Sequence, residues 1–96
     1  MTEHGEQLSE QKATELMASV PDWTLGDDII SREFKLKDIR ESMSFAESVV
    51  DLAEEQAHHP DIYISFNHVT LVLTTHKVGG LTQSDFTLAA AIDRLI

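Results

Sequence analysis

The sequence predicts an α+β fold of two layers, in which three helices cover one face of a four-stranded antiparallel sheet, in the chain order αββαββα. Three observations predict this class. In two places, two segments of alternating apolar and polar residues are separated by a short turn, which is the pattern of a β-hairpin. Three other stretches place apolar residues at helical spacing. One of these helical stretches separates the two hairpins, which favours a single antiparallel sheet covered on one face.

The first part of the chain is predicted to hold a helix and a hairpin. Ser9 is a suitable N-cap, and apolar residues recur at helical spacing over residues 9–20. Pro21 ends this helix because proline cannot continue it. A short strand around residues 23–25 and a turn at residues 26–28 then lead into a second strand, predicted over residues 29–36.

A long amphipathic helix follows from Asp38 and ends before Pro60. Its apolar residues fall on one stripe and on the positions beside it, namely Ile39, Met43, Phe45, Ala46, Val49, Val50, Leu52 and Ala53. The length of this apolar stripe predicts a helix that packs along the sheet.

The last part of the chain is predicted to be a hairpin and a helix. Residues 62–67 and 69–76 alternate as strands around a turn at about residues 67–68, and two glycines at 79–80 break the second strand. Thr82 and Asp85 then match a capping box, so a third helix is predicted from there to the C-terminus. Trp23, Phe34, Phe45 and Phe86 are interpreted as core residues.

With 96 residues, the chain has room for one small domain over residues 1–96, of which residues 1–7 are expected to be disordered. A domain of this size buries only about 60–70% of its unfolded surface, so its core is thin. We therefore expect additional stability from association into a homodimer or homotetramer.

The charge is strongly acidic and unevenly distributed. Seven Lys and Arg against seventeen Asp and Glu give a net charge of −10, which argues against direct binding of nucleic acid or of an anionic membrane surface. There is no cysteine and no apolar run of about 20 residues, so the sequence predicts a cytoplasmic protein without a membrane segment. Residues 56–96 carry little net charge but hold four of the five histidines.

Three of these histidines are candidate proton-transfer groups. His58 and His59 stand at the end of the long helix, and His76 closes the last strand before the two glycines. Two imidazoles in one pocket can supply both an acid and a base, because the unperturbed pKa of imidazole lies near 6.5. The alternative for His58 and His59 is simple capping of a helix C-terminus. A second alternative is a metal site, since three histidines and a water form a known zinc arrangement.

Two carboxylates lie near these histidines in the predicted fold. Asp85 already has a structural role as the acid of the capping box, but it could also orient an imidazole. Glu54 stands one helical turn before His58. The sequence contains no phosphate-binding loop, no dinucleotide fingerprint, no nucleophile elbow and no zinc-protease motif.

Several short motifs resemble the pterin-4a-carbinolamine dehydratase family over about residues 23–96. They are Glu54-x-x-x-His58-His59-Pro60, Phe66-Asn67-x-Val69, Thr74-Thr75-His76 and Gly80-Leu81-Thr82-x-x-Asp85. The fold of that family, a four-stranded antiparallel sheet with three helices on one side, is the fold predicted above from periodicity alone. Two positions depart from the pattern: Ala57 stands where better-known members carry an acid, and Ile62 where many carry Trp.

The resemblance implies a hydro-lyase that dehydrates 4a-hydroxytetrahydropterin to quinonoid dihydropterin, the recycling step after aromatic amino-acid hydroxylation. It implies no cofactor and no metal. Its catalytic histidines fall on His58, His59 and His76, with His59 and His76 expected to cradle the 4a-hydroxyl and His58 nearest the ring nitrogen. The implied pterin-binding residues are Ala57, His58, His59, Thr74, Thr75, His76 and Lys77, and the supporting carboxylates are Glu54 and Asp85.

Two other functions stay open at this point. One is a non-catalytic dimerisation module, because the family resembles a coactivator that binds a homeodomain transcription factor and because the long helix is strongly amphipathic. The other is a metal-dependent hydrolase that uses the same histidines.

Overall fold

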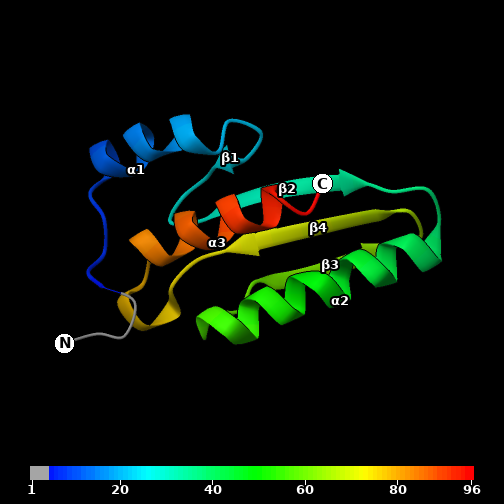
Figure 1. Cartoon of the computed structure of the whole chain (residues 1–96). Coiled ribbons are helices and arrows are strands. Elements are labelled where there is room, and N and C mark those ends of the chain that lie inside the picture. Colours follow the sequence, from blue (N-terminus) through cyan, green and yellow to red (C-terminus); the bar gives the residue numbers. More distant parts are fainter. Residues whose placement is uncertain (1–4) are drawn as a thin grey trace.

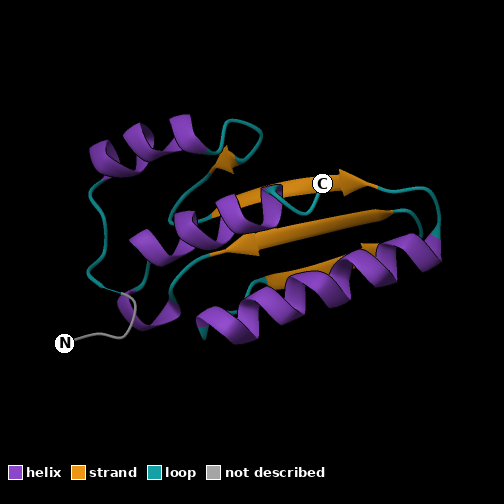
Figure 2. Ribbon diagram, viewed as in Figure 1, coloured by secondary structure: helices purple, strands orange, loops and turns teal. Residues whose placement is uncertain are grey.

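The structure, a computed structural model, describes residues 5–96. Figures 1 and 2 show a sheet whose strands run side by side, with helices packed against it. The fold is α+β with three helices and a four-stranded antiparallel sheet, as the sequence predicted. The expectation of disorder over residues 1–7 falls in part on residues 1–4, which lie outside the described residues.

The first helix, α1, spans Glu10–Leu16 and begins at Ser9, whose side chain accepts a hydrogen bond from the Lys12 N–H. It is shorter than the predicted residues 9–20. The chain tightens into a 3₁₀ helix, η1 (Met17–Ser19), where the Ser19 hydroxyl donates to the Leu16 carbonyl at 2.7 Å. Such tightening satisfies the carbonyls of a last helical turn that cannot be extended into Pro21.

The sheet has the strand order β1-β2-β4-β3, and every neighbouring pair is antiparallel. The strands are β1 (Thr24–Leu25), β2 (Ile30–Lys35), β3 (Asp61–Ser65) and β4 (His68–Leu73). The turn between β3 and β4 consists of Phe66 and Asn67, because Ser65 pairs with His68. The predicted turn at residues 67–68 is therefore wrong by one residue, and His68 lies inside β4.

The strands alternate between a covered face and an open face. The covered positions of β2 and β4 include Ile30, Phe34, Leu71 and Leu73, all of them buried. The residues of β2 and β4 that point to the open face, such as Glu33, are exposed or half-buried. Helices on one face only account for this alternation, which follows from the two-residue period of a strand.

Two further helices complete the covered layer: α2 (Ile39–Gln56) and α3 (Gln83–Asp93). The four aromatic residues predicted in the core, Trp23, Phe34, Phe45 and Phe86, are all buried. The end of α3 is joined to the sheet by Asp93, which accepts hydrogen bonds from the Trp23 indole at 2.8 Å and from Arg32 at 2.7 Å.

The apolar stripe predicted on α2 divides between two environments. Phe45, Val49 and other residues of the stripe face the core, whereas Ile39, Met43 and Val50 are 41%, 54% and 43% exposed. A band of apolar side chains on α2 is thus left uncovered in the monomer. Within residues 5–96, no helix is long and apolar enough to cross a membrane.

Candidate active site

The structure brings His58, His59 and His76 around one open hollow of about 260 Å³. The hollow lies where the end of α2 meets the loop that follows β4. Seven residues line it, namely Ala57, His58, His59, Thr74, Thr75, His76 and Lys77. These are the seven residues that the sequence resemblance singled out for pterin binding.

The end of α2 is shaped by a left-handed residue. Ala57 has a φ of 52°, its N–H donates to the Glu54 carbonyl at 3.3 Å, and the His58 N–H donates to the Ala53 carbonyl at 3.0 Å. These two bonds form the Schellman pattern that ends many helices, in which the left-handed position usually holds glycine. The reversal directs the chain from the helix toward β3 and places the two histidines at the corner.

His58 turns inward and is only 5% exposed. Its Nε2 lies 2.5 Å from Oδ1 of Asp85, which is itself fully buried. Asp85 also forms the predicted capping box, because its Oδ2 accepts the Thr82 N–H at 2.9 Å. The two roles considered for Asp85, capping a helix and orienting an imidazole, are therefore combined in one carboxylate.

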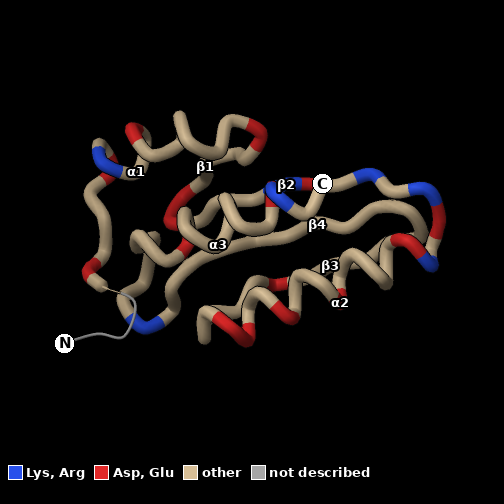
Figure 3. The backbone as a smooth tube through the Cα atoms, viewed as in Figure 1, with Lys and Arg blue, Asp and Glu red and all other residues tan. Residues whose placement is uncertain are grey.

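His59 turns outward. Its Nε2 pairs with Oε2 of Glu54, and both side chains are mostly exposed, at 59% and 68%. Solvent screens such a pair, so it orients the imidazole only loosely. Other acidic residues lie along the same helix, as Figure 3 shows.

His76 does not close β4 as predicted, because β4 ends at Leu73. The Thr75 N–H instead donates to the Gly80 carbonyl at 3.0 Å, so the chain folds back on itself and His76 begins a short 3₁₀ helix, η2 (His76–Val78). Gly79 ends η2 with a φ of 74°, a value that glycine adopts without strain. His76 is exposed at the rim of the hollow.

Two other segments hold this loop in place. The Thr74 hydroxyl donates to the Asp28 carbonyl at 2.6 Å, in the turn between β1 and β2. The Leu8 N–H donates to the Leu81 carbonyl at 2.7 Å. A Cβ at Gly80 would lie 2.4 Å from the amide nitrogen of the Gln7 side chain, so that side chain would have to move to make room. The sequence contained no signal for these contacts, because they join residues far apart in the chain without a shared motif.

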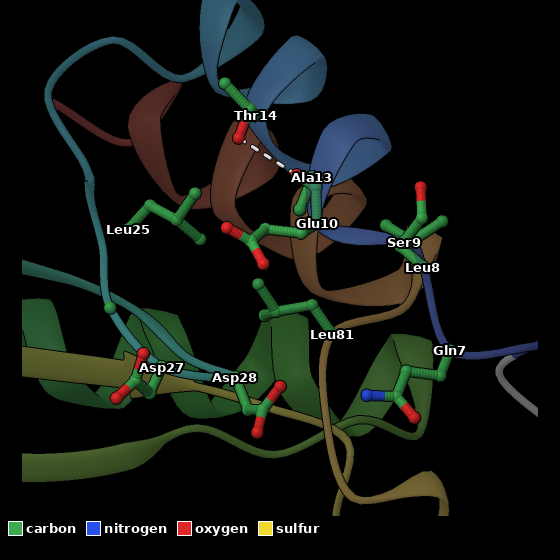
Figure 4. A pocket seen from close by; sticks show the side chains of 11 residues that line it. Gln7, Leu8, Ser9, Glu10, Ala13, Thr14, Leu25, Asp27, Asp28 and Leu81 are labelled. Carbon is green, nitrogen blue, oxygen red and sulfur yellow. Dashed lines mark hydrogen bonds between the residues drawn. The ribbon is translucent and has the colours of Figure 1, made fainter.

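A larger hollow of about 770 Å³ lies elsewhere, between α1, the β1–β2 turn and Leu81. Figure 4 shows carboxylates of Glu10, Asp27 and Asp28 around it. It contains no histidine, and the hydroxyls of Ser9 and Thr14 are already bonded to backbone groups of α1. In residues 5–96, no three His, Asp or Glu side chains are grouped so as to hold a metal ion.

The fold and the histidine-lined hollow define a class of small α+β proteins with a pocket at the junction of a helix end and a strand end. Comparison with known proteins then names the family. The family described as Pterin 4 alpha carbinolamine dehydratase matches residues 6–95, and this chain belongs to it.

Relatives of similar length support this assignment. A Chloroflexus aurantiacus protein named after pterin-4-alpha-carbinolamine dehydratase is 48% identical over 89 residues, which cover 93% of this chain and 96% of the relative. A Picosynechococcus protein of the same name is 44% identical over 92% of this chain and 96% of its own length.

Two solved structures share the fold. The transcriptional coactivator/pterin dehydratase from Brucella melitensis superposes with a TM-score of 0.88 at 28% identity, covering 94% of this chain and 98% of its own. A pterin dehydratase-like protein, described as a RuBisCO assembly factor in the alpha-carboxysome, superposes with a TM-score of 0.62 at 17% identity over 98% and 93% of the two chains. The second likeness concerns the fold alone.

Proposed function

We propose that this protein dehydrates 4a-hydroxytetrahydropterin to quinonoid dihydropterin by histidine acid–base catalysis, within the recycling of a tetrahydrobiopterin-type cofactor. The observation that carries the proposal is the convergence of His58, His59 and His76 on one hollow. Membership of the dehydratase family and the names of relatives at up to 48% identity support the reaction class.

The reaction removes the elements of water from one flat ring system. The C4a–O bond breaks while an acid protonates the departing oxygen, and a base takes the proton from ring nitrogen N5. The electron pair of the N5–H bond then forms the double bond between N5 and C4a. Positioned acids and bases contribute typically 10²–10⁴ to the rate of such steps.

We assign the three imidazoles by their surroundings. His59 and His76 are exposed on the rim, where the 4a-hydroxyl can lie between them and water can leave. His58 is placed nearest N5, because Asp85 holds its ring in one orientation deep in the hollow. The remaining lining residues, Ala57, Thr74, Thr75 and Lys77, would contact the pterin, with Glu54 supporting His59.

The test follows the decay of 4a-hydroxytetrahydropterin, generated in situ, by absorbance with and without protein. We expect His59→Ala and His76→Ala each to lower turnover by about 10²–10⁴ while the fold is kept. His68→Ala is the matched control, because His68 lies in β4, paired with Lys35 and Ser65, and does not line the hollow. Equal turnover in wild type and both rim variants would refute the assignment.

A non-catalytic dimerisation or coactivator module is the second candidate. It is favoured by the uncovered apolar side chains of Ile39, Met43 and Val50 on α2. Because the same side chains could pack against a second copy of the chain, we also propose that the protein assembles as a homodimer or homotetramer. This candidate requires that His59→Ala and His76→Ala leave association and partner binding unchanged, with no acceleration of dehydration by the wild-type protein.

A further inference from the structure

Four buried polar side chains form one connected group beneath the hollow. Thr82 and Asp85 are fully buried, Thr75 is 3% exposed and His58 is 5% exposed. They come from three segments: the loop after α2, the loop after β4 and the start of α3. Among residues 5–96, no buried side-chain nitrogen or oxygen lacks a hydrogen-bond partner, and this holds for every polar side-chain atom of the group that is buried.

The direction of each hydrogen bond can be worked out. The Thr75 hydroxyl donates to Oδ2 of Asp85 at 2.8 Å. A threonine hydroxyl has a single hydrogen, so in its contact of 2.9 Å with the Thr82 hydroxyl Thr75 must accept and Thr82 must donate. Oδ2 also accepts the Thr82 N–H. The order of donation is therefore Thr82 to Thr75 to Asp85.

This order determines what Asp85 offers to His58. Two donors, the Thr75 hydroxyl and the Thr82 N–H, occupy Oδ2, and an ionised carboxylate can only accept hydrogen bonds. Its other oxygen, Oδ1, is then an acceptor for the Nε2–H of His58. A neutral imidazole has one protonated nitrogen, so a proton held on Nε2 leaves the lone pair on Nδ1.

We propose that Thr75 is a positioning residue of the dehydratase site, one whose hydroxyl anchors Asp85 and thereby keeps the proton of His58 on Nε2. Thr75 touches the hollow, but its hydroxyl is directed into the protein. Without this hydroxyl, Oδ2 accepts one hydrogen bond instead of two, so the carboxylate can rotate. The hydrogen bond between Oδ1 and the imidazole then weakens. The importance of this for catalysis rests on the proposed function, whereas the position of the proton does not.

The variant that isolates the hydroxyl is Thr75→Val, which keeps the shape of the side chain. Thr75→Ser keeps the hydroxyl and loses a methyl group. The protonation of the two ring nitrogens of His58 is read from two-bond ¹⁵N–¹H correlation spectra at alkaline pH, without any pterin. We expect Nε2 to be protonated in the wild type and in Thr75→Ser, and the proton to be shared between the two nitrogens in Thr75→Val.

Thr74→Val is the matched control for the spectra, because Thr74 is the neighbouring threonine but bonds to the Asp28 carbonyl and not to Asp85. We expect it to leave the His58 spectrum unchanged. Should Thr75→Val not fold, Thr75→Ala removes the same hydroxyl with smaller steric demand and is read in the same way. A proton that stays on Nε2 in the variant lacking the hydroxyl overturns the proposal.

The kinetic readout is separate. We expect Thr75→Val to lower kcat by about 10-fold with little change in KM, and Thr75→Ser to restore it. An equal fall in both variants would also overturn the positioning role. If the wild type shows no dehydration at all, the proposed function fails, while the spectra still decide whether Thr75 sets the proton of His58.

Discussion

His58 and His59 are adjacent in the chain, and their surroundings are opposite. The ring of His58 is buried and bound to a carboxylate that is itself held by Thr75 and Thr82. The ring of His59 is 59% exposed and pairs with the exposed Glu54. Two identical residues thus acquire different roles from the position of the backbone, since successive side chains of an extended chain point to opposite sides. The buried histidine is fixed by the fold, whereas the exposed one has room to change its orientation.

The largest difference in stability is expected between variants of the two carboxylates that pair with these histidines, Asp85 and Glu54. Asp85→Ala should lower the free energy of unfolding by about 3–5 kcal/mol, because it leaves several buried donors without an acceptor. Glu54→Ala should lower it by about 1 kcal/mol or less, since the pair is solvent-screened. Urea unfolding followed by the fluorescence of the buried Trp23 measures both. Equal losses would mean that the two pairs do not differ as described.

A smaller difference is expected from the histidines themselves. His58→Ala should cost about 2–3 kcal/mol, because it removes the partner of a buried charged oxygen. His59→Ala should change stability by less than about 0.5 kcal/mol, as is usual for an exposed side chain. The same unfolding measurement applies. A stability loss in His59→Ala as large as that in His58→Ala would contradict the exposed position of His59.

The smallest effect on stability is expected from Ala57, the left-handed residue that directly precedes the buried His58 and the exposed His59. Ala57 adopts a φ of 52°, which costs more for alanine than for glycine. Ala57→Gly should therefore raise the free energy of unfolding by about 0.5–1 kcal/mol, with the helix end unchanged. Thermal unfolding by circular dichroism measures this gain. Destabilisation by glycine would indicate that residue 57 is not left-handed.

Much of the fold could be predicted from local patterns. The cap at Ser9 and the capping box of Thr82 and Asp85 are short-range signals, and the structure has both. The alternation that predicted the hairpins also determines which side chains are buried, because the strand period and the covered face coincide. The clustering of His58, His59 and His76 was expected from the family resemblance and from a strand end lying near a helix end.

The remaining features depend on contacts that periodicity does not encode. The alternating pattern of residues 69–76 extends past Leu73, where β4 ends, because the fold-back of Thr75 onto Gly80 is a tertiary contact. The turn was misplaced because Phe66 adopts a φ of 49°, which is uncommon for a bulky residue. Likewise, nothing in the sequence distinguished the outward His59 from the inward His58, because the two share one residue type and one local motif.

The bonds that enclose the hollow have a kinetic consequence. The contact of His58 with Asp85 joins residues 27 positions apart, and that of Thr74 with Asp28 joins residues 46 positions apart. The helix α2 and the hairpin of β3 and β4 are local and can form early, whereas closing long loops is slow. We therefore expect the hollow to be assembled late in folding, so that a pterin, under the proposed function, would bind only the fully folded protein.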